Sequence, residues 1–372
     1  MNSFEADDVR DADPNAWGDG TDPMEIPERV RQAFPALAGR LALRTLSGGL
    51  LHRSLHVRAQ SGEYVLQRVS DVFAPEIHDN IAAVTHHLKE RGFATLELLP
   101  TRDGALWIDL PSQGRWRLLT HLAGESFERI ESELQARSAG ALVGRFHAAL
   151  DDFDAPLAPM GIPLRNTPRY IDRLRRALEE HTDHRLASEV RAIAAWIEER
   201  LARLGPPPLV PDRVIHGDLK LANLLFEGTH PPERDRAIAL VDFDTLMWAP
   251  LWGEWGDAWR SWCHRRKPDG RGAHFDLEIF AASLAGFVQG YARPLSRAEA
   301  DSLVLAAERV SLELCVRFAT DMLEESYFAW DEARFETAAE HNAFRVREQQ
   351  GFFDAAANCR GVRAEIVEGA TR

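Results

Sequence analysis

Apolar and polar residues follow two different periodicities along the chain, and the change falls near Gly124. Over residues 40–68 apolar and polar positions alternate, and the glycine-containing turns at 47–49 and 61–62 interrupt the alternation twice. Alternation of this kind between turn signals is typical of half-buried strands. The pattern therefore predicts three antiparallel strands in this part of the chain.

The next segment, residues 75–92, has its apolar residues at helical spacing and ends in a glycine. This pattern predicts an amphipathic helix. Residues 105–111 and 114–122 again read as strands, with a turn between them. We therefore expect a small five-stranded antiparallel sheet with one helix over residues 40–122, preceded by a short helix at 27–37.

After Gly124 the apolar residues keep a helical period almost to the end of the chain. The predicted helical segments are residues 131–152, 168–204, 252–266, 275–292, 297–325 and 332–350. The fold class expected is α+β, in two lobes. These are a sheet-rich N-lobe over residues 26–122 and a mostly helical C-lobe over residues 123–372, after a flexible acidic tail at 1–25.

The charge balance narrows the range of partners. The formal net charge is −14, and residues 1–25 hold eight acidic residues against one arginine. Such a surface repels phosphate backbones and acidic lipid headgroups, so we expect neither nucleic acid nor a membrane as partner. A small molecule is the expected partner, and the composition leaves the oligomeric state open.

Cysteine use and apolar runs point to a cytoplasmic protein. The three cysteines are widely spaced, which fits neither a disulfide framework nor a zinc site. No apolar run reaches the length of a transmembrane helix, and the acidic N-terminus has no signal-peptide core.

The segment that carries chemistry is residues 212–226, DRVIHGDLKLANLLF. An apolar strand leads into a turn at His216-Gly217-Asp218, and Asn223 follows Asp218 by five positions. Further along, a second buried strand ends in two carboxylates, Asp242 and Asp244. A capped turn followed by an acidic strand end is the alternative without function.

Phosphoryl transfer needs these residue types. Asn223 and Asp242 offer the hard oxygen ligands that Mg²⁺ prefers, and Asp218 provides a carboxylate that accepts a proton from a hydroxyl. Lys220 supplies a cation for the transferred group, and it is one of only three lysines among 44 basic residues. His216 is interpreted as structural, orienting the loop, because Asp218 suffices as the base.

The predicted N-lobe should then hold the nucleotide. Ser47, Gly48 and Gly49 lie between two predicted strands, where glycine amides approach phosphate groups, although an ordinary hairpin turn explains them equally well. Kinase-like folds place a lysine on the third strand, but here that strand reads Tyr64 to Val69 without one. Gln67 or Arg68 is the expected replacement. The adenine is expected against Thr120 and Leu122.

HGDLKLANLLF followed by LVDFD resembles the aminoglycoside phosphotransferase and choline kinase superfamily, small-molecule kinases of protein-kinase-like fold. The resemblance spans about residues 40–350. YVLQRVSDVFAPEIHDNIAAVTHHL, VDFDTLMWAP, RFATDMLEESYF and HNAFRVREQ are similar to one branch, the bacterial N-acetylhexosamine 1-kinases. Gly217, where that branch often has asparagine, and His52 depart from its pattern.

The resemblance implies a role for each matching position. Asp218 would be the base, Asn223 and Asp242 the Mg²⁺ ligands, and Lys220 and Arg317 contacts to phosphate or acceptor. Asp257 would brace the catalytic loop. The implied cofactors are ATP and Mg²⁺.

Two further features bear on the acceptor. Five tryptophans lie within residues 248–262, and the last four share one helix face, which favours core packing. In the alternative interpretation Trp248 or Trp252 stacks on a sugar ring. Asp244, Trp248 and Arg317 are the acceptor contacts predicted beside Asp218, and arginines lining the pocket would repel a polycationic aminoglycoside.

The sequence thus predicts a Mg-ATP-dependent kinase that phosphorylates a hydroxyl of a small molecule, with an N-acetylhexosamine or related sugar as first candidate. An aminoglycoside, choline or homoserine are alternative acceptors. A nucleotide-binding pseudokinase scaffold is the alternative from another class, and the missing N-lobe lysine is its support.

Overall fold

The computed structural model describes residues 25–46, 52–266 and 272–372. The chain divides into two compact units, each taken by itself below. The sheet unit contains the described part of residues 1–71 together with 96–121, and the helical unit contains residues 72–95 together with the described part of 122–372. The predicted acidic tail, apart from Glu25, and the predicted Ser47-Gly48-Gly49 loop lie outside the described residues.

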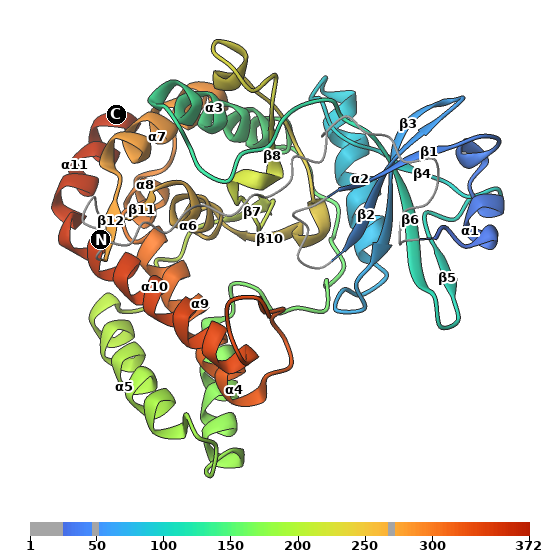
Figure 1. Cartoon of the computed structure of the whole chain (residues 1–372). Coiled ribbons are helices and arrows are strands. Elements are labelled where there is room, and N and C mark those ends of the chain that lie inside the picture. The colour runs from blue at the N-terminus through green and yellow to red at the C-terminus, as the bar shows by residue number, and fades with distance from the viewer. Residues whose placement is uncertain (1–24, 47–51, 267–271) are drawn as a thin grey trace, which may run out of the picture. The chain divides into compact units, whose positions relative to one another are not determined.

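The sheet unit is built on an antiparallel sheet of six strands in the order β1-β2-β3-β6-β4, with β5 also paired to β6 (Figure 1). The elements of this unit are α1 (Glu28–Ala33), the 3-10 turn Pro35–Leu37, β1 (Ala42–Leu46), β2 (Arg53–Ala59), β3 (Gly62–Val69), β4 (Leu98–Leu99), β5 (Ile108–Leu110) and β6 (Gly114–Thr120). The five predicted strands are present. The sixth, β4, has two residues, which is too short to produce an alternating pattern.

Alternation along the strands separates two faces of the sheet. Leu55 on β2, Leu66 on β3 and Leu118 on β6 are in register, and all three are fully buried. Their face packs in one cluster with Val30 and Phe34 from the α1 region. The residues between them point the other way, since successive strand residues alternate sides.

The helical unit contains ten helices and three short strand pairs among its described residues. The helices are α2 (Ile77–Glu90), α3 (Glu133–Ala149), α4 (Thr167–Glu180), α5 (Ala187–Leu204), α6 (Leu251–Trp262), α7 (Leu277–Tyr291), α8 (Arg297–Leu303), α9 (Ala306–Glu324), α10 (Ala338–Asn358) and α11 (Arg360–Thr371). The strand pairs are β7 (Asp212–Ile215) with β10 (Met247–Pro250), β8 (Leu224–Phe226) with β9 (Ala237–Leu240), and β11 (His264–Arg266) with β12 (Ala273–Phe275).

Several predicted helix boundaries are wrong. The segment 168–204 forms two helices because its polar residues 181–186 leave the helical path, and 297–325 breaks at residues 304–305. The segment 252–266 stops being helical at Trp262 and continues as strand β11, and α11 was not predicted. The predicted helix at 75–92, α2, groups with the helical unit rather than with the sheet. The side-chain amide of Asn80 explains this grouping, because it bonds both the N–H and the carbonyl oxygen of Ala158 at 2.8 Å.

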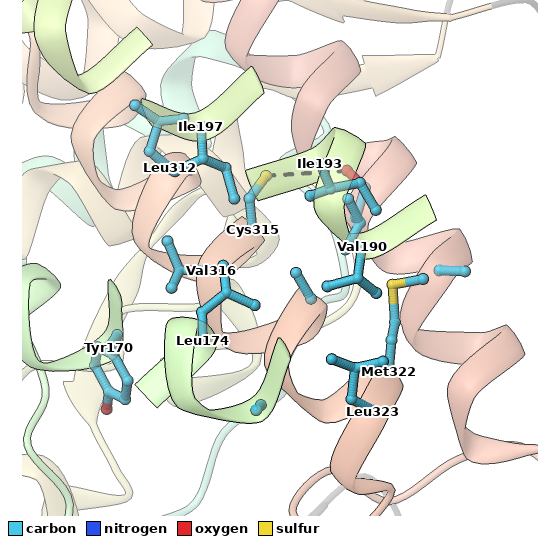
Figure 2. Close-up of a cluster of buried hydrophobic side chains, with 14 of the residues drawn as sticks. Tyr170, Leu174, Val190, Ile193, Ile197, Leu312, Cys315, Val316, Met322 and Leu323 are labelled. Carbon is cyan, nitrogen blue, oxygen red and sulfur yellow. Dashed lines mark hydrogen bonds between the residues drawn. The ribbon is translucent and has the colours of Figure 1, made fainter. Parts of the chain in front are cut away.

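Helix α9 runs through the helical unit and contacts α4, α5, α6 and α10. In Figure 2, Leu174 of α4 and Val190 and Ile193 of α5 surround Cys315 and Val316 of α9. All five are at least nine-tenths buried. Burial raises the pKa of the Cys315 thiol above its usual value, so this cysteine packs as a small apolar side chain. Among the described residues, no helix has the length and apolar character needed to cross a bilayer.

Helices α3 and α7 touch through glycines on both sides. A Cβ atom on Gly140 of α3 would lie 1.9 Å from the carbonyl oxygen of Ser283, and one on Gly286 of α7 would lie 2.0 Å from that of Arg137. Gly144 and Gly290 repeat the close approach one helical turn further along. The two backbones are therefore in direct contact, with no space for a methyl group.

Replacing Gly286 with alanine forces the α3 and α7 backbones apart. We expect Gly286→Ala to lower the free energy of unfolding by about 1–3 kcal/mol, the usual cost of overpacking. Gly369→Ala in α11 is the matched control, since no atom lies within 4 Å of its Cβ position, and its expected change is neutral or a gain of about 0.5–1 kcal/mol. Urea unfolding measures both. Equal stabilities of the two variants would contradict the proposed contact.

Candidate active site

The loop between β7 and β8 carries the residues that the sequence singled out, and two strand pairs hold its ends. Before the loop, Ile215 at the end of β7 pairs with Met247 of β10. After it, Leu224 at the start of β8 pairs with Leu240 of β9, and the Val241 N–H donates to the carbonyl oxygen of Asn223 at 3.0 Å. The second pairing brings Asp242, which follows β9, beside the loop.

Four of the predicted residues meet at this point. Lys220 Nζ lies 3.0 Å from Asp218 Oδ2 and 3.8 Å from Asp242 Oδ2. Asn223 Nδ2 donates to the backbone oxygen of Asp218 at 2.8 Å and to its Oδ2 at 3.1 Å. The side chains of Asp218, Lys220 and Asp242 each keep about a third of their surface exposed. The cluster is therefore ordered by its own contacts and still open to a ligand.

The charges in the cluster stabilise one another. Burial alone would raise the pKa of Asp218, but Lys220, His216 and Arg260 outweigh it and hold the pKa below its usual range. Burial likewise disfavours the charged form of Lys220, but Asp218 and Asp242 keep its pKa above the usual value. At neutral pH the cluster therefore contains a carboxylate paired with an ammonium group.

The donor set suits a divalent cation of the Mg²⁺ type. Because the Asn223 amide nitrogen is turned to Asp218, its Oδ1 is the atom that would bind a metal, and Asp242 adds a carboxylate. Asp242 adopts a left-handed backbone conformation (φ 68°, ψ 60°), which few residues other than glycine tolerate and for which aspartate and asparagine are enriched. Asn223 of the loop thus offers an amide oxygen, and Asp242 beside the loop offers a carboxylate oxygen.

His216 joins the loop to the strand that precedes Asp242. Its Nε2 donates to the carbonyl oxygen of Val241 at 2.9 Å, and its Nδ1 accepts from the N–H of Asp218 at 3.4 Å. The two ring nitrogens thus contact the end of the second strand and the loop itself. His216 is fully buried, and this position suits the structural role predicted for it.

A buried carboxylate that the sequence analysis missed holds the same loop from behind. Glu254 on α6 accepts the N–H of His216 at 2.9 Å and the N–H of Gly217 at 3.0 Å, one on each carboxylate oxygen. His147 Nε2 on α3 lies 3.5 Å from Glu254 Oε1. Burial would raise the pKa of Glu254, but His147, His216 and the Gly217 N–H outweigh burial and lower it. The carboxylate therefore stays ionised although its side chain is fully buried.

Among the described residues, Asp257, the residue predicted to brace the loop, reaches it through Arg165. Its Oδ1 lies 3.0 Å from Arg260 and 3.6 Å from Arg165. Arg165 in turn donates to the carbonyl oxygen of Gly217 at 3.1 Å. The direct brace is Glu254, three positions earlier. The only sequence signal for Glu254 is an acidic residue among the tryptophans of an otherwise apolar helix face.

Gly217 is the loop position where only glycine fits. Its φ is 82°, and a Cβ atom would lie 2.5 Å from the carbonyl oxygen of Thr245. Thr245 Oγ1 donates to the carbonyl oxygen of His216 at 2.7 Å, and this bond holds the same two backbone segments together. The glycine at this position therefore follows from how closely two backbones approach.

The tryptophans divide into a buried set and one exposed member. Trp255, Trp259 and Trp262 are fully buried, as the core interpretation predicts, and Trp262 Nε1 donates to the carbonyl oxygen of Leu219 in the catalytic loop at 2.9 Å. Trp248 keeps 38% of its surface exposed, and its Nε1 donates to Ala155 at 3.2 Å.

Asp244 and Arg317, two of the predicted acceptor contacts, lie in different surroundings. Asp244 belongs to the turn Phe243–Thr245 and is buried, with only 2% of its surface exposed. Arg317 lies on α9 and lines a cavity of the helical unit.

Gln67 and Arg68, the predicted replacements for the missing lysine, lie on opposite faces of the sheet because they are neighbours on β3. Gln67 lies across from Ser54 and Arg117, donating to the first at 3.0 Å and accepting from the second at 2.8 Å. Arg68, as the next residue on β3, is on the opposite face, where it packs against Gly114. The two candidates for the missing lysine therefore do not face the same ligand. Arg117 is a buried cation that the sequence analysis did not single out.

The two remaining nucleotide candidates lie where β6 ends. Thr120 Oγ1 accepts a hydrogen bond from the N–H of Glu97 at 2.9 Å, so its hydroxyl is already bonded to the protein backbone. Leu122 is the first residue of the helical unit after β6.

Glu254→Gln tests the brace through stability. The amide keeps one acceptor oxygen but turns an NH₂ group toward a backbone N–H, so we expect the free energy of unfolding to fall by about 1–3 kcal/mol at neutral pH. The folded-state pKa of Glu254 lies below the ordinary value of 4.5. The unfolded chain therefore takes up a proton first as the pH falls, and the wild type loses stability there. The variant should lose less over the same pH range.

Urea unfolding at a series of pH values measures both effects. Glu278→Gln, an exposed residue in the first turn of α7, is the control and should change neither. If wild type and Glu254→Gln lost stability equally steeply in acid, Glu254 would not be the ionised brace.

Comparison with known proteins places this site in a family. The model of the phosphotransferase enzyme family matches residues 42–295, which include the whole loop and Asp242. A homoserine kinase from Bradyrhizobium sp. (strain ORS 278) is 24% identical over 285 residues, covering 76% of this chain and 81% of the relative.

Solved kinase structures share the fold. A microcompartment-associated aminopropanol kinase superposes with a TM-score of 0.56 at 17% identity, covering 87% of this chain and 94% of that one. An amicoumacin kinase, solved with AMP-PNP, Ca²⁺ and its antibiotic, gives a TM-score of 0.55 at 14% identity, covering 88% and 91%. The chain belongs to the phosphotransferase enzyme family, and it is a small-molecule kinase with an α+β, protein-kinase-like fold.

Proposed function

We propose that this kinase transfers the γ-phosphoryl group of ATP to a hydroxyl of a small polar acceptor, with Asp218 as the group that orients the hydroxyl and accepts its proton. The carrying observation is the contact set of Asp218, Lys220 and Asn223 beside Asp242, within 4 Å of one another in successive steps. In the transfer, the acceptor oxygen bonds to phosphorus as the bond to the ADP oxygen breaks. The hydroxyl proton passes to Asp218.

Each residue of the cluster has a distinct task in this proposal. Lys220 keeps Asp218 ionised and places a positive charge where the transferred group gains negative charge. Asn223 and Asp242 would hold Mg²⁺, which when bound neutralises phosphate charge. Glu254 and His216 keep the loop backbone in place, so that the Asp218 carboxylate is positioned before the acceptor arrives. The AMP-PNP complex of the amicoumacin kinase supports ATP as the donor.

For the acceptor we propose candidate chemical classes rather than one compound. The branch-specific segments of the sequence favour an N-acetylhexosamine or related sugar. The homoserine kinase relative favours a hydroxy amino acid as second candidate. Aminoglycoside and choline remain weaker alternatives, and a pseudokinase scaffold is disfavoured by the complete catalytic cluster. A cytoplasmic location stays a prediction from the sparse cysteines.

Asp218→Asn separates an enzyme from a scaffold. The amide cannot accept the hydroxyl proton, so we expect kcat to fall by roughly 10²–10⁴, while ATP binding measured by calorimetry is kept. ADP release is measured with N-acetylglucosamine, N-acetylgalactosamine, kanamycin, choline and L-homoserine. Asp301→Asn on the surface of α8 is the control and should retain full activity. ATP binding without any Asp218-dependent ADP release would contradict the proposed transfer.

Lys220→Met tests how the base is kept ionised. Removing the ammonium group should raise the pKa of Asp218, because burial then acts without its main counter-charge. Since the carboxylate is the active form, the acid limb of the kcat/KM profile should move to higher pH, in addition to any fall in the maximal rate. Lys89→Met, at the exposed end of α2, should leave the profile unchanged. An unmoved acid limb in Lys220→Met would rule out this role.

A further inference from the structure

The helical unit contains a cavity of about 270 Å³ beside the end of α9. It is lined by α4, by α9, by Tyr327 and Phe328 after α9, and by the loop 161–163. All of these segments belong to one unit, so the cavity does not depend on how the two units are placed. This volume is close to the lower end of the range for small-molecule sites, about 300 Å³.

The acidic groups in the cavity wall are already engaged. Asp321 accepts the backbone N–H groups of Ser326, Tyr327 and Phe328 at 2.8–2.9 Å, and the side-chain amide of Asn342 at 2.9 Å. Glu324 receives both the Nε and an Nη of Arg173. The wall therefore contains two carboxylates whose charges are compensated by protein donors.

Arg317 is the charge in this wall without an acidic partner. Its only side-chain hydrogen bond within the described residues goes from Nη2 to Tyr327 Oη at 3.1 Å, and it forms no ion pair there. Its guanidinium carbon lies 5.2 Å from the ring centre of Tyr170, 5.5 Å from that of Tyr327 and 5.4 Å from that of Phe328. Three rings thus hold the cation in one place and take part of its water away.

Tyr170 supplies a second unsatisfied donor to the same cavity. The residue is 94% buried, being 6% exposed, and its hydroxyl has no hydrogen-bond partner in the part of the chain that is described. Burial raises the pKa of Tyr170 to about 12, so the hydroxyl stays protonated. In Figure 2, Tyr170 lies at the edge of the buried cluster, with its oxygen directed away from the labelled apolar side chains. A buried donor of this kind is costly unless a ligand accepts its hydrogen bond.

A short chain of contacts connects the cavity to the catalytic loop. Glu313 precedes Arg317 by one turn of α9, on the same face of the helix. Glu313 Oε1 lies 3.6 Å from Arg165, which donates to the carbonyl oxygen of Gly217, next to Asp218. These contacts link helix α9, which lines the cavity, to the loop that carries Asp218.

We propose that the acceptor of this kinase carries a carboxylate group, which Arg317 and the Tyr170 hydroxyl bind in this cavity. The inference rests on the proposed function, because it assigns the acceptor of that same transfer. Among the described residues of the wall, Arg317 is one positive charge without an acidic partner, which matches a monoanion, whereas a phosphate dianion would need a second such charge. A carboxylate is also the anion whose planar geometry matches a guanidinium group. Hydroxy amino acids and acidic sugars fit this description, so among the sugars of the proposed function it favours acidic members over neutral N-acetylhexosamines.

Matched pairs of acceptors, with and without the carboxylate, test the inference. The pairs are L-homoserine with 2-amino-1,4-butanediol, N-acetylmuramic acid with N-acetylglucosamine, and glucuronic acid with glucose. We expect at least one carboxylate member to exceed its neutral partner by about tenfold or more in kcat/KM, mainly through KM. In Arg317→Gln that ratio should fall to near one, because the carboxylate member then loses its advantage over the neutral partner. Tyr170→Phe should reduce the ratio by a smaller factor.

Arg345→Gln is the matched control. Arg345 also packs over Phe328 and over Phe318, but it lies outside the cavity wall and bonds Ala329 and Asn342. Its removal should leave the carboxylate preference unchanged. Thermal unfolding shows which variants are folded. If Arg317→Gln does not fold, Tyr170→Phe still tests the inference.

Calorimetry with the same compounds, in the presence of Mg-ADP, decides the inference independently of turnover. Binding of a carboxylate member that is lost in Arg317→Gln supports it, even if Asp218→Asn shows no role for the base. Three results would overturn the inference. They are a preference for the neutral members, a preference for carboxylates that Arg317→Gln retains, and no carboxylate binding at about 10 mM. Asp218-dependent phosphorylation of neutral members alone would overturn the carboxylate inference and keep the proposed function.

Discussion

The catalytic loop depends on one buried carboxylate. Glu254 accepts two consecutive backbone N–H groups, those of His216 and Gly217, from a position that water does not reach. Without it, both amides would be buried without partners, and the turn that points Asp218 outward would have no fixed backbone. The charge is in turn maintained by His147 on α3. The packing of α3 on α7 through paired glycines therefore supports the loop from two layers away.

A second constraint is electrostatic and acts on the open side of the same loop. Asp218 and Asp242 are like charges near one another, and Lys220 lies between them. The ammonium group keeps Asp218 ionised, and it lies 3.8 Å from the carboxylate of Asp242. The loop thus has a buried side that holds the backbone and a charged, partly exposed side where we propose that the chemistry takes place.

Helix α9 joins the apolar core to the cavity lined by Arg317 and Tyr170. One face of it, with Leu312, Cys315 and Val316, packs into the apolar cluster between α4 and α5. Another face presents Glu313 and Arg317, which contact Arg165 and the aromatic rings of the cavity. Because the apolar face fixes the helix in register, the positions of the two charged side chains are fixed as well. Core packing and the shape of the cavity are therefore coupled through a single element.

The sequence by itself determined the elements that repeat a local pattern and the residues that form a contiguous motif. Alternation predicted the five longer strands, and the spacing of Asp218, Lys220 and Asn223 before a strand ending in Asp242 identified the loop, because these signals depend only on neighbours in the chain. Tertiary structure decided what depends on distant segments. It showed that Glu254 accepts two N–H groups of the loop while Asp257 lies beside Arg165, which bonds the loop, and that Gln67 and Arg68 point to opposite faces. It also showed that Arg317 and Tyr170, about 150 residues apart, line one cavity, since only packing sets which side chains meet.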